Sequence, residues 1–154
     1  MLKKRLGLEA IEERWSSPKK IRRYYKIQST TLVIPDGCEW IGYRAFKDCT
    51  CLEKVVISDG VKRIGSYAFG DCDKLKEVVI PESVEIIESD AFAWCSKLEK
   101  VVIPESVKVI MRGAFRECKN AEITLYKSRW KLNIGESAFW NCKCVRHVEK
   151  ETRD

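Results

Sequence analysis

The chain has 154 residues and a formal net charge of +6, with 45% hydrophobic and 34% charged residues. That balance predicts one globular domain and excludes an intrinsically disordered chain, which has too few apolar residues to form a core. No segment approaches the ~20 consecutive apolar residues that cross a bilayer, so we expect no membrane span. The N-terminus lacks the apolar stretch and cleavage site of a signal peptide, which predicts a cytoplasmic location.

The first 30 residues hold the whole excess of positive charge, because they contain nine Lys or Arg and only three Glu. Leu6, Ile11 and Trp15 fall on one face of a helix over residues 2–15, which predicts a helical cap. The segment that follows mixes basic residues with tyrosines, and such a segment binds phosphates while its rings stack on bases. It is equally typical of a sheet edge that positive charge protects from pairing. The candidate nucleic-acid-binding residues are Lys19, Lys20, Arg22, Arg23, Tyr24, Tyr25 and Lys26.

An internal repeat follows this segment. The dipeptide Ala-Phe recurs with spacings of 23, 23, 23 and 24 residues, starting at Ala45, Ala68, Ala91, Ala114 and Ala138. Each of these Phe residues precedes a cysteine by three positions, and segments such as KLKEVVIPESVEII and KLEKVVIPESVKVI are nearly identical. Such a period predicts a solenoid in which each repeat forms one coil.

One repeat shows how a coil is built. In residues 52–72 the apolar spacing predicts short extended segments at 52–57 and 61–64, and a tight turn or single helical turn at 68–72. One coil cannot offset its own loss of conformational entropy, so the coils must stack, with equivalent strands paired in parallel. Charges at equivalent exposed positions then alternate in sign between neighbouring coils. The alternating rows are Glu53, Lys76 and Glu99; Lys54, Glu77 and Lys100; and Glu39, Lys62, Glu85 and Lys108.

The repeats resemble the BspA-type leucine-rich repeats, whose units read approximately L-x-x-I-x-I-P-x-x-V-x-x-I-G-x-x-A-F-x-x-C. The resemblance covers roughly residues 31–145, with Ser58 in place of the proline, Glu88 and Met111 in place of the glycine, and an irregular last unit. It implies a mainly β solenoid of about five 23-residue coils with parallel strand ladders. Residues 1–30 would form the basic cap, and residues 146–154 a C-terminal tail.

Two sets of residues are candidates for contact with a partner protein. The first is the outward position of the first extended segment, occupied by Val33, Val56, Val79 and Val102. An exposed valine row suits a binding surface, although valine also favours strands for its own packing. The second set consists of tryptophans expected at the surface, a residue type enriched in binding hot spots but also able to cover a neighbouring turn. These tryptophans are Trp40, Trp94 and Trp140.

The cysteines and the single histidine give little support for catalysis or metal binding. Five of the eight cysteines share the repeat position beside Phe, where a thiol behaves as a small buried hydrophobic group, and Cys38 occupies a position held elsewhere by valine. The C-x-C pairs lack the spacing of a zinc site. No phosphate-binding glycine loop or nucleophile elbow is present. We therefore expect no metal, no cofactor and no enzymatic activity.

The sequence predicts a non-enzymatic recognition module that binds a protein partner, which is also the role that the resemblance implies. The alternative is a small basic factor that contacts nucleic acid or a nucleic-acid-handling machine, for example a phage-type inhibitor of host nuclease defence. In either case we expect a monomer, or weak self-association through an open solenoid end or the valine surface.

Overall fold

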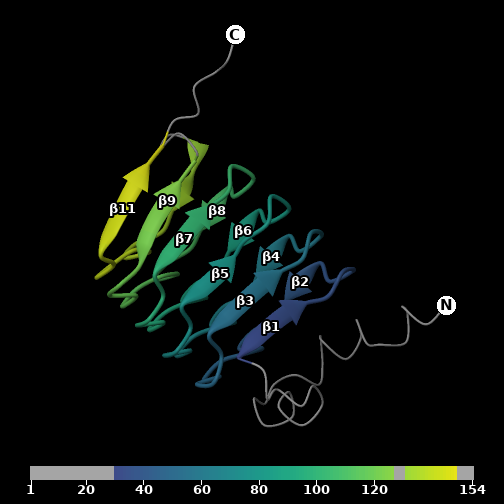
Figure 1. Ribbon diagram of the computed structural model, residues 1–154. Helices are drawn as coiled ribbons and strands as arrows, with labels where there is room; N and C mark the ends of the chain where they lie inside the picture. Colours follow the sequence, from purple (N-terminus) through teal and green to yellow (C-terminus); the bar gives the residue numbers. More distant parts are fainter. Residues whose placement is uncertain (1–29, 127–130, 149–154) are drawn as a thin grey trace, which may run out of the picture.

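The computed structural model describes residues 30–126 and 131–148, in which the chain winds into stacked coils (Figure 1). Coils 1 to 5 comprise residues 30–52, 53–75, 76–98, 99–121 and 122–144, and a last strand follows. Each coil has a first strand on one side, a short second strand on another side, and a turn that leads into the next coil. The strands are β1 Thr31–Ile34, β2 Trp40–Ile41, β3 Lys54–Ile57, β4 Arg63–Ile64, β5 Glu77–Val79, β6 Ile86–Ile87, β7 Lys100–Ile103, β8 Val109–Ile110, β9 Glu122–Leu125, β10 Asn133–Ile134 and β11 Cys144–His147.

The strands form two parallel sheets that lie on different sides of the solenoid (Figure 1). The long sheet has the order β1-β3-β5-β7-β9-β11, and the short sheet has the order β10-β8-β6-β4-β2. Equivalent residues of successive coils pair directly, as in Val33 with Val56 and Trp40 with Arg63. The predicted mainly β solenoid with parallel strand ladders is therefore confirmed.

The core runs the length of the solenoid because one face of each strand is apolar. Burial alternates along the first strands, as in β1 and β7, where every second residue is buried. Behind them the phenylalanines of the Ala-Phe pairs form a stack. Ring centroids lie 5.2, 5.2, 5.0 and 5.9 Å apart along the series Phe46, Phe69, Phe92, Phe115 and Phe139. Such contact between coils makes the fold depend on stacking, as expected for a repeat array.

The repeated cysteines tie each coil to the one before it. The thiols of Cys72, Cys95 and Cys118 donate hydrogen bonds of 3.0–3.2 Å to phenylalanine carbonyl oxygens of the preceding coil. Burial raises the pKa of the Cys142 thiol to about 12, and this thiol donates to the Phe115 carbonyl oxygen at 3.1 Å. The Cys142 thiol therefore remains protonated at neutral pH and keeps its donor role.

The turns form a third hydrogen-bonded side of the solenoid, here called the turn side, which comprises residues 43–48, 66–71, 89–94, 112–117 and 136–141. In each of coils 1 to 4 three turn amides donate to carbonyl oxygens of the next coil, as Arg44 does to Ser66 at 3.0 Å and Asp48 to Gly70 at 2.9 Å. Both donors have the left-handed φ, 54° and 60°, that aims their N–H groups at the next coil. The described residues contain no α-helix, so the coil closes by a tight turn. The predicted N-terminal helical cap lies outside the described residues.

Opposite charges lie next to each other on the outside of the coils. Lys54 pairs with Glu77 at 2.8 Å and Lys76 with Glu53 at 2.9 Å, both across adjacent coils. These contacts follow the alternating rows expected from the sequence. Exposed pairs of this kind contribute only about 0–1 kcal/mol each, so they favour the register of the coils more than their stability.

Candidate recognition surfaces

Four valines form a row on the outer face of the long sheet, here called the valine row. Val33 pairs with Val56 and Val56 with Val79, while Val102 pairs with Thr124 in coil 5. Val33, Val79 and Val102 are 58%, 44% and 48% exposed, and Val56 is half-buried. The structure thus places the four predicted valines on one face, where apolar methyl groups meet solvent.

A groove interrupts this face between coils 3 and 4. β5 and β7 pair only at Glu77 and Lys100, whereas β7 and β9 pair along four residues. Beyond the single pair a groove of about 750 Å³ opens between the strands. Its lining combines valine and isoleucine side chains with lysine and glutamate side chains, so that it has apolar walls and charges of both signs. Its lining residues are Lys76, Glu77, Val78, Val79, Ile80, Glu99, Lys100 and Val102.

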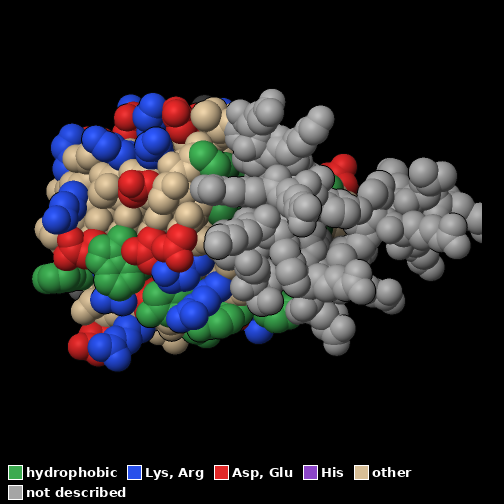
Figure 2. Space-filling model, turned by 90° about the horizontal axis from the view of Figure 1, so that it is seen from below, with side chains coloured by type: hydrophobic (Ala, Val, Ile, Leu, Met, Phe, Trp, Pro, Cys, Tyr) green, Lys and Arg blue, Asp and Glu red, His purple; other side chains and the backbone are tan. Residues whose placement is uncertain are grey.

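The three predicted tryptophans are exposed but do not join the valine row. Trp40 is 41% exposed in β2 of the short sheet, beside Arg63. Trp94 and Trp140 are 36% and 60% exposed and belong to the turn side, in coils 3 and 5. The seven predicted contact residues therefore occupy three sides of the solenoid and do not form one patch. Exposed apolar side chains lie among acidic and basic ones on the described surface seen in Figure 2.

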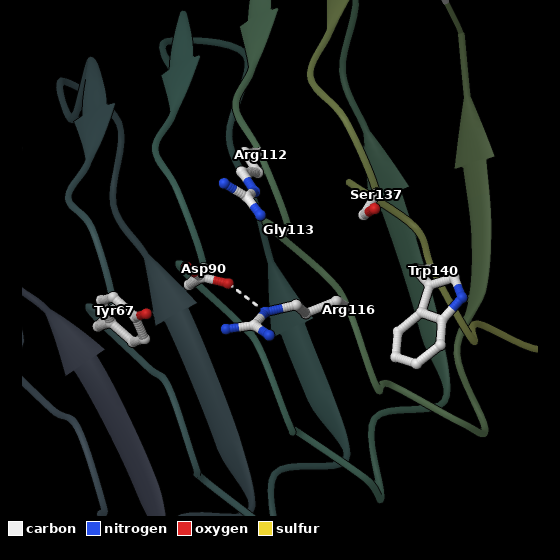
Figure 3. A pocket seen from close by; sticks show the side chains of 7 residues that line it. All are labelled: Tyr67, Asp90, Arg112, Gly113, Arg116, Ser137 and Trp140. Atoms are coloured by element: carbon white, nitrogen blue, oxygen red, sulfur yellow. Dashed lines mark hydrogen bonds and ion pairs between the residues drawn. The ribbon is translucent and has the colours of Figure 1, made fainter.

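A polar hollow of about 340 Å³ lies on the turn side across coils 2 to 5 (Figure 3). Its residues come from different coils, and the Asp90 and Arg116 side chains lie in the space that a side chain on Gly113 would occupy. A Cβ atom on Gly113 would lie 2.5 Å from Asp90 Oδ1, so no larger residue fits while Asp90 keeps its place. The lining residues are Tyr67, Asp90, Arg112, Gly113, Arg116, Ser137 and Trp140.

Arg116 is fixed in this hollow from two directions. Its Nε donates to Asp90 Oδ1 of the preceding coil, and its guanidinium carbon lies 3.9 Å from the centroid of the Trp94 ring. Burial works to lower the Arg116 pKa, and the interactions with Asp90 and Tyr67 outweigh it, so that the pKa is raised. Because Trp94 is partly covered by this cation, it supports Arg116 and offers less free surface than Trp140.

The sequence reasoning did not find the hollow, although the aligned repeats carry a signal for it. The position of Gly113 holds Arg44, Tyr67, Asp90 and Ser137 in the other coils. Gly113 has a left-handed backbone conformation, and the other coils have larger residues at this position. Such a glycine indicates that coil 4 lacks a side chain which the other coils have there. What the alignment does not show is that Arg116 reaches back to coil 3 to meet Asp90.

Several sequence predictions concern residues that the structure does not describe. The candidate nucleic-acid-binding residues, 19–26, all lie there, and so does most of the basic cap. Within the described ranges, no group of three His, Cys, Asp or Glu side chains is arranged to hold a metal ion. The same part of the chain contains no helix of the length and apolarity needed to span a membrane.

The fold defines a class of protein, a parallel β solenoid with two sheet sides and one turn side per 23-residue coil. Within this class the chain belongs to the BspA-type leucine-rich repeat family. The family model, described as the BspA type leucine rich repeat region, matches six copies over residues 20–146. This match begins inside the segment predicted as the cap, ten residues before its expected end at residue 30. A comparison with curated protein sequences gave no match.

Solved structures agree with the family. A leucine rich cell surface protein of Faecalibacterium prausnitzii is 30% identical with a TM-score of 0.70, and the alignment covers 80% of this chain and 32% of that one. A leucine-rich repeat protein of Bacteroides ovatus is 30% identical with a TM-score of 0.67, covering 78% and 33%. The pneumococcal vaccine antigen PcpA, 21% identical with a TM-score of 0.64 over 80% and 31%, shares the fold. The chain thus spans about a third of the length of these proteins.

Proposed function

We propose that this chain is a non-enzymatic protein-recognition module whose partner contacts the outer face of the long sheet at the groove between β5 and β7. The observation that supports the proposal most strongly is the interrupted pairing, which turns a flat strand ladder into a groove with apolar walls. Partner side chains gain most binding energy where they enter such a recess and lose their water. Leucine-rich repeat families generally act as scaffolds for protein interaction, which agrees with this role.

The valine row alone is too small for a stable complex, because a standard interface covers roughly 800 Å² on each partner. The charged rows beside it provide the remaining area. Lys54, Glu77 and Lys100 lie in register across β3, β5 and β7, and present charges of alternating sign. A partner with a complementary order of charges would be oriented by them, and an apolar side chain of that partner would enter the groove.

The cellular location is part of the proposal. All eight cysteines are free thiols, which suits a reducing compartment such as the cytoplasm. The F. prausnitzii structure is that of a cell surface protein, so a surface location is the competing outcome. Labelling of intact and lysed source cells with a membrane-impermeant reagent, followed by detection of the chain, distinguishes the two.

The groove is tested with threonine substitutions, because Thr124 already occupies the equivalent position in coil 5 and shows that threonine fits the strand. A partner is first captured from lysate of the source organism with and without nuclease, and its affinity for the purified chain is then measured. We expect the double variant Val79→Thr, Val102→Thr to bind at least about tenfold more weakly, since hot-spot losses exceed ~1.4 kcal/mol.

The matched control is Val33→Thr, the same change on the same face but two coils from the groove. We expect it to alter the affinity less than about twofold and all variants to keep the unfolding midpoint, because exposed substitutions shift stability by only ~0.5 kcal/mol. Equal affinity of the double variant and the original chain would refute the groove as the contact site. A partner that is lost on nuclease treatment would instead favour nucleic-acid contact.

A further inference from the structure

The polar hollow on the turn side is a second place where the molecule can hold a ligand, and it lies apart from the long sheet. It forms because two repeat positions change together. Gly113 removes a side chain in coil 4, and Trp140 adds a large one in coil 5. Coils 2 and 3 have Gly70 and Ala93 at the position of Trp140, and both residues are buried. The result is a recess with an aromatic wall at one end.

One wall of the recess is rigid before any ligand arrives. Arg116 is held by the Asp90 carboxylate, and its guanidinium carbon lies 3.9 Å from the centroid of the Trp94 ring. Its side chain is only 30% exposed, and that of Asp90 only 13%. A guanidinium that is already oriented loses little freedom on binding, so its remaining N–H groups are available at low entropic cost.

Arg112 supplies an uncompensated charge at the same recess. It is exposed, and within residues 30–126 and 131–148 it forms no ion pair. In Figure 3, Arg112 and Arg116 lie one above the other, with Asp90 on one side and Trp140 on the other. Two guanidinium groups against one carboxylate give the lining a net positive charge, which suits a ligand carboxylate bound by a guanidinium fork.

The other lining residues match a ligand that has more than a negative charge. Trp140 is 60% exposed and presents an aromatic ring to the recess (Figure 3). The faces of such rings are electron-rich and attract the polarised C–H groups of a saturated ring. Asp90 accepts hydrogen bonds, while the hydroxyl groups of Tyr67 and Ser137 both donate and accept them. A ligand that matches this set has hydroxyl groups, a carbon face and one negative charge.

We infer that the hollow binds an acidic saccharide, with the ring of a hexuronic acid unit against Trp140 and its carboxylate on Arg112. The volume of about 340 Å³ lies at the lower end of the range of ligand pockets, roughly 300–1,000 Å³, and accommodates one sugar unit. Inorganic phosphate would leave Trp140 without a contact. An acidic peptide side chain would leave Asp90 without hydroxyl donors.

The test compares two sugars that differ only in the carboxylate, methyl glucuronide and methyl glucoside. Each is titrated into the isotope-labelled chain, and the shifts of the backbone and indole N–H signals give the dissociation constants. We expect the glucuronide to bind with a dissociation constant on the order of 1 mM, as its size allows. The glucoside should bind about tenfold more weakly, and the largest shifts should belong to the Trp140 indole and to residues around Gly113.

Three variants assign the contacts. Arg112→Gln should bring the two sugars to within about twofold of each other, because the carboxylate loses its partner. Arg112→Lys should restore only part of the preference, since an ammonium group lacks the fork. Trp140→Ala should weaken both sugars by at least about tenfold. The control Trp40→Ala removes an exposed tryptophan from the short sheet and should change neither dissociation constant.

The inference is overturned if both sugars bind equally to the original chain, or if neither shifts the Trp140 indole signal. It is also overturned if inorganic phosphate, or a capped glutamate peptide, binds the hollow as tightly as the glucuronide. The altered residues are exposed and far from the groove, so unfolding midpoints should stay unchanged and partner binding at the long sheet should persist. A negative result with the sugars would therefore leave the proposed protein contact at the groove unaffected. A negative result for the groove variants would likewise leave the proposed sugar site unaffected.

Discussion

The buried phenylalanine stack and the turn-side positions around the hollow follow the same period. They differ in how much the residue type varies from coil to coil. All five coils have phenylalanine in the stack. The position of Gly113 has five different residue types in five coils, and so does the position of Trp140, where Lys47, Gly70, Ala93 and Arg116 stand in the other coils. Both regions lie within three residues of each other in every repeat.

The difference shows what a solenoid requires of its repeats. A buried side chain must match its equivalents on both sides, because each ring packs against the next at about 5 Å. At the positions of Gly113 and Trp140 the contact between coils is made by backbone hydrogen bonds, which do not depend on residue type. Stability is therefore carried by the positions that repeat, and the hollow is formed by positions that vary between coils.

Among the substitutions that test this comparison, Phe92→Ala is expected to change the free energy of unfolding most. Phe92 is fully buried between Phe69 and Phe115, so the change opens a cavity in the middle of the stack. We expect a loss of about 3–5 kcal/mol in the free energy of unfolding, measured by urea titration. Trp140→Ala is the matched control on the turn side and should lose less than ~0.5 kcal/mol. Comparable losses for the two variants would show that the turn side carries stability after all.

An intermediate effect is expected from Gly113→Ala, which combines backbone strain with a clash. Gly113 has a φ of 63°, and an added Cβ would meet Asp90 Oδ1 at 2.5 Å. The control is Gly37→Ala, where φ is 88° but no atom lies within 4 Å of the added Cβ. We expect about 1–3 kcal/mol of destabilisation for Gly113→Ala and about 1 kcal/mol for the control by urea titration. Identical losses would mean that the Asp90–Arg116 pair moves aside freely.

The smallest effect is expected from the exposed ion pair between Lys108 and Glu85, which lie 2.6 Å apart. The hydrogen bond from Lys108 lowers the Glu85 pKa below its ordinary value of 4.5. A lowered pKa in the folded state adds stability above the ordinary value, and that stability is lost as the pH falls through the lowered one. The midpoint of thermal unfolding of Glu85→Gln should therefore lie slightly below that of the original chain at pH 7. The difference should disappear in strong acid and shrink in high salt, whereas a constant difference across pH would exclude the ion pair as its cause.

The sequence predicted the solenoid, its register and its core because each of these properties is repeated. The spacing of Phe46, Phe69 and Phe92 is visible without any structure, and so is the alternation of Glu53 and Lys76. It also indicated that Trp94 and Trp140 are exposed. Their roles in binding stay predictions, as do those of the valine row.

The sequence does not predict the groove or the hollow, for two different reasons. The segments around β5 and β7 contain the identical run VVIPESV, at 78–84 and 101–107, so no residue there marks where pairing ends. The hollow depends on Arg116 turning back by one coil to Asp90, a contact between residues 26 positions apart. A repeat pattern predicts contacts between equivalent positions, and this contact joins two positions that are not equivalent.

The backbone of the turn side also has a net electric dipole along the solenoid. Its peptide groups accept a hydrogen bond from the preceding coil and donate one to the next, as the Ser66–Tyr67 peptide does between Arg44 and Ser89. Three such peptide dipoles per coil point the same way, and aligned peptide dipoles add together as they do in a helix. Within the described part of the chain the amides of Ser137 and Phe139 find no acceptor, so the positive end of this row lies at coil 5. The potential that the backbone creates there favours anions beside Trp140 over anions at coil 1.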